Sequence, residues 1–236
     1  MKNLIVASTS TIYGMGYLEY LLPTLAKHFE NVETLIFIPY ARPGGASHDE
    51  YTKKVAETFS KIGKKVIGLH TFENPKEAIK TAQGIFTGGG NTFLLVKQLY
   101  ETEVMPVLRE TLANGTPYLG CSAGSNITGL TMETTNDMPI IYPPSFQTLG
   151  LLPFNINPHY LDPVQGSTHM GETRETRINE FHQFNDQVVV GLREGSWLEV
   201  KSSNIVLKGN LTARIFKKGQ TPIEIEAETD LTDWIV

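Results

Sequence analysis

Cysteine and long runs of a single residue class are scarce in this sequence. Cys121 is the only cysteine among 236 residues, so no internal disulfide can form, and we expect a reducing, cytoplasmic environment. Apolar stretches such as residues 4–7 fall far short of the roughly 20 residues that cross a bilayer and of the about 7–15 residues of a secretory signal core. We therefore expect no membrane segment and no secretion signal.

Runs of basic residues are also short, because none exceeds two residues. The chain has 20 Lys and Arg and 25 Asp and Glu, so its formal net charge is −5. Nucleic-acid binding needs clustered positive charge, so nucleic acid is not an expected partner. A hydrophobic share of 40% and a charged share of 19% are typical of a globular chain. No repeat, low-complexity tract or linker divides the sequence, and we predict one domain over residues 1–236.

Strands alternate with helices through the first 130 residues. Short apolar runs predict strands at 4–7, 35–38, 66–69, 84–87 and 117–120, and helical spacing of apolar residues predicts helices between them. This order is typical of an α/β protein with a mainly parallel, doubly wound sheet. Four later segments, 188–192, 197–200, 205–207 and 213–216, are expected to end that sheet as antiparallel strands.

The stretch from 138 to about 166 loses this periodicity and gains six prolines. It predicts long ordered loops around one short strand at 154–157, and a helix follows at 172–184. Loops of this length are usually functional. In a parallel sheet the active site lies beyond the carboxyl ends of the strands, so we expect these loops to border it.

The strongest local signal is the G-x-S-x-G pattern centred on Ser122. It follows a predicted strand and precedes a helical segment, which is the context of a nucleophile elbow. Ser122 is therefore the candidate nucleophile, and the N–H of Ala123 a candidate oxyanion donor. Cys121 does not fit the pattern, because its flanking positions are Leu119 and Ala123. A tight turn without chemistry is the alternative interpretation.

A serine nucleophile needs a base and an acid that orients the base. His28, His48 and His182 fall on predicted helices and are interpreted as structural, whereas His70 and His169 remain open candidates.

His159 follows the short strand in the long loop region and is the preferred base. Asp137 lies between Ser122 and His159 in the chain and is the preferred acid, with Glu194 as its rival.

A second glycine cluster, Gly88 to Gly90, also lies between a strand and a helix, where backbone N–H groups can face an anion. Gly90 is the candidate for the second oxyanion donor. The cluster lacks the third glycine of a dinucleotide fingerprint, so no cofactor is expected. His159, Asp162 and His169 match no known metal-ligand spacing, so no metal is expected either.

Six motifs in order, GGGNTF, GCSAGSN, TTNDMP, NINPHY, GETRETRI and GLREGSW, together resemble those of serine peptidase family S51, which includes aspartyl dipeptidases and cyanophycinase-like enzymes. The resemblance implies a class I glutamine amidotransferase-like (flavodoxin-like) fold. It also implies hydrolysis of small dipeptides with an N-terminal aspartate, without a cofactor.

Carried over residue by residue, the resemblance makes Ser122 the nucleophile and His159 the base, with Asp137 or Glu194 as the acid. It implies that Arg174 grips the aspartate side chain and that Asn91 lines the same pocket. Arg177 lies three residues beyond Arg174 on the same predicted helix, and a surface ion pair is expected for at least one of the two.

Two alternatives remain open. One is a cyanophycinase-like or isoaspartyl amide hydrolase with the same triad, and the other is a non-catalytic protein that binds a small anion. No membrane partner is expected, and both a monomer and a homodimer are compatible with the sequence.

Overall fold

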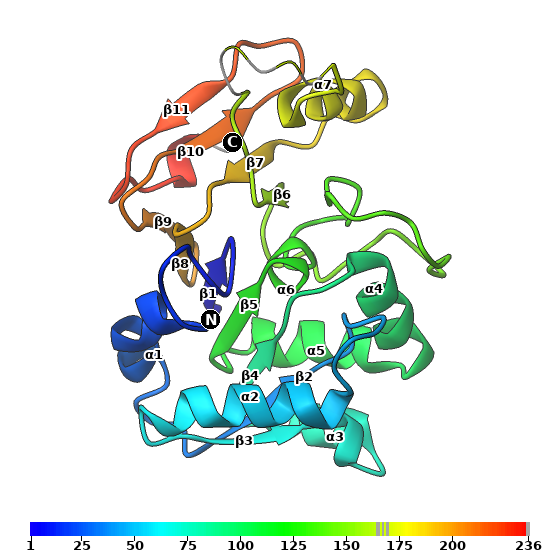
Figure 1. Ribbon diagram of the computed structural model, residues 1–236, viewed down its shortest axis with the longest axis vertical. Coiled ribbons are helices and arrows are strands. Elements are labelled where there is room, and N and C mark those ends of the chain that lie inside the picture. Colours follow the sequence, from blue (N-terminus) through cyan, green and yellow to red (C-terminus); the bar gives the residue numbers. More distant parts are fainter. Residues whose placement is uncertain (164–165, 167, 169, 235–236) are drawn as a thin grey trace.

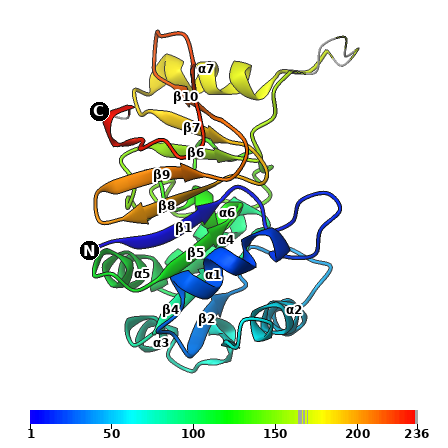
Figure 2. The same ribbon diagram turned by 90° about the vertical axis from the view of Figure 1, so that its left-hand side faces the viewer.

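The computed structural model describes residues 1–163, 166, 168 and 170–234. It contains a large seven-stranded sheet and a smaller four-stranded sheet. The smaller sheet and its helix stand above the large sheet in both views (Figures 1 and 2). None of the helices in these described ranges is long and apolar enough to cross a membrane.

The large sheet has the strand order β3-β2-β4-β5-β1-β8-β9. Its first five strands pair in parallel, β8 runs antiparallel to β1, and β9 runs antiparallel to β8. The mainly parallel α/β sheet predicted from the sequence is therefore confirmed. The strands are β1 (Asn3–Ala7), β2 (Thr34–Ile38), β3 (Lys65–Gly68), β4 (Gly84–Thr87), β5 (Tyr118–Cys121), β8 (Trp197–Lys201) and β9 (Asn204–Lys208).

Helices cover both faces of this sheet. Side chains alternate between faces along a strand, so Ile85 of β4 joins one core cluster and Phe86 joins the other. The cluster of Phe86 receives α1 (Leu22–His28) and α2 (His48–Ser60), and the cluster of Ile85 receives α3 (Pro75–Lys80), α4 (Thr92–Glu101) and α5 (Val104–Ala113). Short 3-10 turns, Glu19–Leu21, Leu69–Thr71 and Thr232–Trp234, complete the helical elements.

The smaller sheet has the order β11-β10-β7-β6. Its strands are β6 (Asn155–Pro158), β7 (Val189–Leu192), β10 (Ala213–Phe216) and β11 (Ile223–Ile225). β6 and β7 are parallel, and the other two pairs are antiparallel. The helix α7 (Arg174–Phe184) packs on this sheet through Ile178 and Phe181.

The prediction that all late strands end one sheet was therefore wrong in part. β8 and β9 do so, but β7 and β10 belong to the smaller sheet. The burial pattern gives the reason, because all four residues of β7 are buried, whereas β8 alternates. β7 needs cover on both faces and obtains it from α7 on one side and from the main core on the other, where Val190 and Leu192 join the cluster of Ile85.

The predicted long loops lie on both sides of β6, and the part after β6 is described to residue 163 and at residue 166. Those before β6 follow the short helix α6 (Ala123–Asn126). They are tied down by backbone contacts, including a bridge between Thr131 and Gln147 and two hydrogen bonds from Arg109 to the carbonyl oxygens of Thr148 and Leu149. Leu152 and Phe154 at the end of this segment are buried. The segment is thus part of the core as well as a border of the candidate site.

Candidate functional site

Ser122 sits on a strained turn between β5 and α6, with φ 55° and ψ −112°. A side chain at Gly120 would stand 2.4 Å from the carbonyl oxygen of Gly124, and one at Gly124 would stand 2.2 Å from that of Thr87. Only glycine fits at either position. The G-x-S-x-G pattern therefore forms the strand-to-helix turn expected of a nucleophile elbow.

His159 contacts both Ser122 and Glu194. Its Nε2 lies 2.9 Å from Ser122 Oγ, and its Nδ1 lies 2.6 Å from Glu194 Oε1. The three side chains form one hydrogen-bonded line, as nucleophile, base and orienting acid do in serine hydrolases.

The register of the smaller sheet brings His159 and Glu194 together. β6 and β7 run parallel with Pro158 opposite Leu192, so the residues that follow the two strands leave the sheet at the same edge. The N–H of Tyr160 donates to the carbonyl oxygen of Leu192 and extends the pairing past His159. Glu194, two residues beyond β7, is then within reach of the imidazole.

Asp137, the acid preferred from the sequence, does not contact His159. Its Oδ2 accepts hydrogen bonds from Thr92 N at 2.7 Å, Thr92 Oγ1 at 2.6 Å and Thr135 Oγ1 at 3.1 Å. Thr92 is the first residue of α4, and a carboxylate is stabilised at a helix N-terminus by free N–H groups and the helix dipole. The preference for Asp137 over Glu194 is thus corrected by the geometry.

Ser8 is a site residue that sequence reasoning missed. This buried hydroxyl accepts a hydrogen bond from the N–H of His159 at 2.9 Å and donates to the carbonyl oxygen of Leu192 at 2.7 Å. His159 has a positive φ of 53°, which is uncommon for residues other than glycine. The available signal was a serine directly after β1, at the edge of the sheet where the site was expected.

The glycine loop lies against the nucleophile. A side chain at Gly89 would stand 2.9 Å from Ser122 Cβ, and one at Gly90, whose φ is 148°, would stand 2.1 Å from the carbonyl oxygen of Ala41. The N–H groups of Gly89, Gly90 and Ala123 donate no hydrogen bond to another residue within the described ranges. Gly90 and Ala123, the two predicted oxyanion donors, thus both have unused N–H groups, and Gly89 is the loop residue that lies against Ser122.

Asn91 and Arg174 differ in the hydrogen bonds and ion pairs that their side chains form. Asn91 caps α4 by accepting from Leu94 N at 3.1 Å, and its Nδ2 donates to the carbonyl oxygen of Met138 at 2.9 Å. Arg174 is half-buried at the start of α7 and forms no ion pair with any residue in the described part of the chain.

The charges around Arg174 distinguish it from Arg177. Burial, together with the nearby Arg177, lowers the pKa of Arg174, while the charge of Asp137 acts in the opposite direction. Arg177 is exposed and pairs with Glu172 at 3.5 Å. Arg177 therefore has the surface ion pair, and Arg174 has a guanidinium without a carboxylate partner among the described residues.

The other sequence candidates lie elsewhere or are inert. Cys121 is buried, and burial raises the pKa of its thiol, so the thiolate is disfavoured. His70 pairs with Asp49 at 2.8 Å, and His182 binds a carbonyl oxygen in its own neighbourhood. His169 lies outside the described residues. Within the described residues, no group of three or more His, Cys, Asp or Glu could hold a metal ion.

The chain matches the profile of Peptidase family S51 over residues 4–208. It is 47% identical over 231 residues to "Peptidase E" of Streptomyces coelicolor, covering 98% of this chain and 94% of that protein. It is 45% identical over 234 residues to "Probable alpha-aspartyl dipeptidase" of Drosophila melanogaster, covering 98% and 96%.

Two solved structures have a similar fold. The crystal structure of a peptidase from an acI-B1 Actinobacterium superposes with a TM-score of 0.70 at 17% identity, covering 98% of this chain and 96% of that one. A crystal structure from Listeria monocytogenes EGD-e superposes with a TM-score of 0.67 at 21% identity, covering 89% and 98%. At this level of identity the likeness concerns the fold.

Proposed function

The chain belongs to peptidase family S51, and we propose that it is a serine dipeptidase that hydrolyses dipeptides with an N-terminal aspartate. The observation that carries the proposal is the hydrogen-bonded line from Ser122 through His159 to Glu194. The name of the Drosophila relative supports the choice of substrate, as does the Arg174 guanidinium near Asp137, which can bind a carboxylate in a bidentate fork.

In the proposed reaction, Ser122 Oγ attacks the carbonyl carbon of the N-terminal aspartate while His159 Nε2 accepts the hydroxyl proton. The N–H groups of Gly90 and Ala123 stabilise the negative oxygen of the tetrahedral intermediate. His159 then gives the proton to the leaving amine, and the acyl-enzyme forms. Water, deprotonated by the same imidazole, releases the free aspartate and restores Ser122.

Glu194 is the acid in this mechanism. Its carboxylate accepts from His159 Nδ1, which keeps the Nε2 lone pair directed at Ser122 and stabilises the imidazolium when it forms. Asp137 has a different part, because it holds the first turn of α4 and so the position of Asn91. Asp137 also faces Arg174, where it opposes the loss of charge from that guanidinium.

The fold supports a finer assignment to the class I glutamine amidotransferase type, which we also propose. The supporting feature is a nucleophile turn at the carboxyl end of β5, in the middle of a mainly parallel sheet with helices on both faces.

The proposed function is tested by incubating the purified protein with Asp-Leu, Glu-Leu, Asn-Leu, β-Asp-Leu and N-acetyl-Asp-Leu in the presence of EDTA, with Ser122→Ala as the control. We expect cleavage of Asp-Leu alone and none by the variant. Cleavage of β-Asp-Leu alone would instead favour an isoaspartyl or cyanophycinase-like hydrolase.

The non-catalytic alternative is separated by a fluorophosphonate probe, which reacts with activated serines. Labelling of the wild type but not of Ser122→Ala supports an enzyme. A protein that merely binds a small anion would cut no peptide and would take no label at Ser122.

A further inference from the structure

Two arginines and three carboxylates form a cluster next to the candidate triad. Arg193 donates from Nε and Nη2 to Asp162 at 2.8 and 2.7 Å, and from Nη1 and Nη2 to Glu224 at 2.9 and 3.1 Å. Arg214 Nη1 lies 3.2 Å from Glu175 Oε2, and Arg214 Nε lies 3.5 Å from Glu224 Oε1. We call these five residues the arginine cluster.

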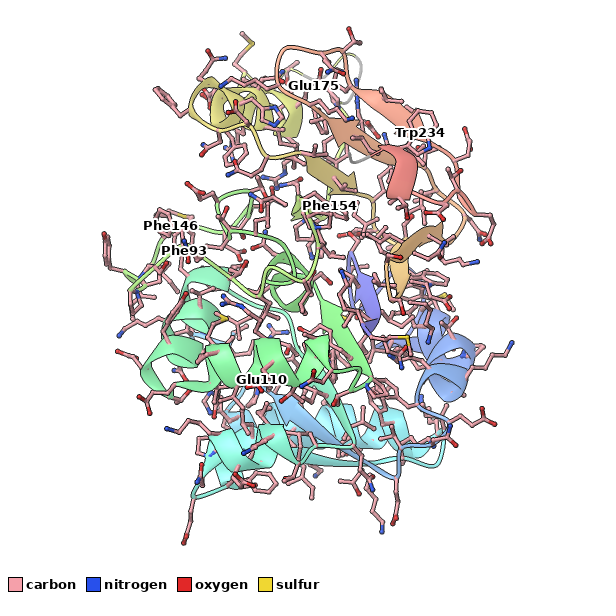
Figure 3. The ribbon with its side chains drawn as sticks, turned by 180° about the vertical axis from the view of Figure 1, so that it is seen from behind. Phe93, Glu110, Phe146, Phe154, Glu175 and Trp234 are labelled. Carbon is pink, nitrogen blue, oxygen red and sulfur yellow. The ribbon has the colours of Figure 1, made fainter. Side chains whose placement is uncertain are left out.

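Members of the arginine cluster are sequence neighbours of the proposed catalytic and binding residues. Arg193 directly precedes Glu194, and Asp162 lies in the segment that follows His159. Glu175 directly follows Arg174 in the first turn of α7. Figure 3 labels Glu175 where α7 begins, beside the smaller sheet. The cluster therefore connects the segments that carry the base and the acid to the helix that carries the substrate arginine.

The first turn of α7 has few other attachments. Ile178 and Phe181 pack on the smaller sheet further along the helix, and within the described residues the side chains of Thr173 and Thr176 hydrogen-bond only within this turn. Among the described residues, Glu175 with Arg214 is the only ion pair between α7 and a strand. This contact thus ties the first turn of α7 to β10.

Three side chains of the arginine cluster are less exposed than those of a typical surface ion pair. The side chains of Arg193, Arg214 and Glu175 are only 14%, 23% and 29% exposed. The hydrogen bond from Arg193 keeps the pKa of Asp162 below its usual value, so this carboxylate stays ionised near neutral pH. Removing one residue of the arginine cluster leaves the charge of its partner unpaired and partly buried.

We propose that Arg214 is a positioning residue for substrate binding, which fixes the first turn of α7 through Glu175 and thereby holds the Arg174 guanidinium in place near Asp137. The inference rests on the proposed function of Arg174 in binding the substrate carboxylate. Arg193 links Arg214 to the segment of Glu194, because both arginines pair with Glu224 and Asp162.

The experiment compares Arg214→Gln, Arg214→Lys, Glu175→Gln and the double variant Glu175→Gln/Arg214→Gln. Two readouts are measured, namely the steady-state kinetics of Asp-Leu hydrolysis and the rate of fluorophosphonate labelling at Ser122, which needs the triad but no substrate carboxylate. Lys65→Gln, which breaks an exposed ion pair with Glu33, is the matched control.

We expect Arg214→Gln and Glu175→Gln each to raise KM about tenfold, with kcat and labelling within about twofold of the wild type. Arg214→Lys should show an intermediate KM. Because the two residues act through one contact, the double variant should be no worse than the more affected single variant.

An unchanged KM in both single variants, additive losses in the double variant, or a parallel fall of labelling and kcat would overturn the inference. If Arg214→Gln does not fold, Glu175→Gln decides, because it only neutralises a partly exposed carboxylate. A wild type that labels at Ser122 but leaves Asp-Leu intact would contradict the proposed substrate itself, and this result is distinct from unchanged KM values in an enzyme that cleaves Asp-Leu.

Discussion

The hydroxyl of Ser8 holds the backbone of His159 in place. Ser8 Oγ accepts from the N–H of His159 at 2.9 Å and donates to the carbonyl oxygen of Leu192 at 2.7 Å. Because Ser8 follows β1 of the large sheet, the contact anchors the base, which follows β6 of the smaller sheet, to the strand next to the nucleophile. It also supports a backbone conformation, with φ at 53°, that an L-residue rarely adopts.

Replacing Ser8 by alanine should therefore lower kcat. The buried N–H of His159 would lose its acceptor, which typically costs about 1–3 kcal/mol, and the imidazole would be held less firmly against Ser122. We expect kcat for Asp-Leu to fall about tenfold or more with little change in KM. Ser10→Ala, which alters a nearby hydroxyl with no side-chain hydrogen bond among the described residues, is the control. Equal activity of the two variants would argue against the anchoring role.

Replacing each carboxylate by its amide should distinguish the roles of Glu194 and Asp137. Glu194→Gln removes the carboxylate that orients His159, and we expect kcat to fall by at least about a hundredfold with the melting temperature nearly unchanged. Asp137→Asn removes a negative charge from the N-terminus of α4, which should cost about 1 kcal/mol of stability. Kinetics and thermal melts on both variants check this, and a larger loss of kcat in Asp137→Asn would reverse the assignment.

The strained backbone of Ser122 predicts that a glycine at this position would stabilise the protein while removing its activity. Ser122→Gly should be inactive but melt a few degrees higher, because glycine tolerates a positive φ and this relief is worth roughly 1 kcal/mol. Ser122→Ala should be equally inactive without that gain, since it keeps the Cβ atom. Differential scanning calorimetry distinguishes the two, and identical melting temperatures would show that the turn is not strained.

Arg174 and Arg177 should differ sharply although they lie on one helix. Arg174→Ala is expected to raise KM for Asp-Leu by about a hundredfold, because a charge-assisted bidentate contact is lost. Arg177→Ala breaks only an exposed ion pair with Glu172, and such pairs contribute less than about 1 kcal/mol. Steady-state kinetics of both variants provide the comparison, and similar KM values would contradict the assignment of Arg174.

Because of His28, the free energy of unfolding should be smaller in mild acid than at neutral pH. Burial, with a smaller contribution from the charge of Lys201, lowers the pKa of His28 to about 4. Below pH 6.5 the unfolded chain therefore takes up a proton that the folded chain takes up only near pH 4. The resulting stability is present above pH 6.5 and is lost as the pH falls toward 4, by roughly 2 kcal/mol at pH 5.

Urea unfolding at pH 7 and pH 5 checks the role of His28. The wild type should lose about 2 kcal/mol more than His28→Gln, which cannot titrate but can still donate a hydrogen bond toward Tyr118. An equal loss in both proteins would contradict the prediction.

Features that depend on neighbouring residues could be predicted from the sequence. The five parallel strands are apolar runs between helical segments, and the turn at Ser122 needs only Gly120 and Gly124 beside it. Both follow from local patterns, because a strand buried on both faces and a turn without room for Cβ atoms admit few residue types.

The orienting acid could not be predicted in this way. Asp137 and Glu194 both follow segments that border the site, and only the parallel pairing of β6 with β7 brings Glu194 to His159. That pairing joins residues 34 positions apart in the chain, such as Asn155 and Val189, and no local pattern predicts it. Ser8 was missed for the same reason, since its partner, His159, lies at a sequence separation of 151.

The division of the site between two sheets has a consequence for the folding of the chain. Ser122 follows a strand of the large sheet, whereas His159 and Glu194 follow strands of the smaller one, which β10 and β11 complete later in the chain. A chain in which only the large sheet is formed holds a serine without a base, because His159 is placed by β6. Ser122 therefore has its base and its acid only when the smaller sheet has folded against the large one.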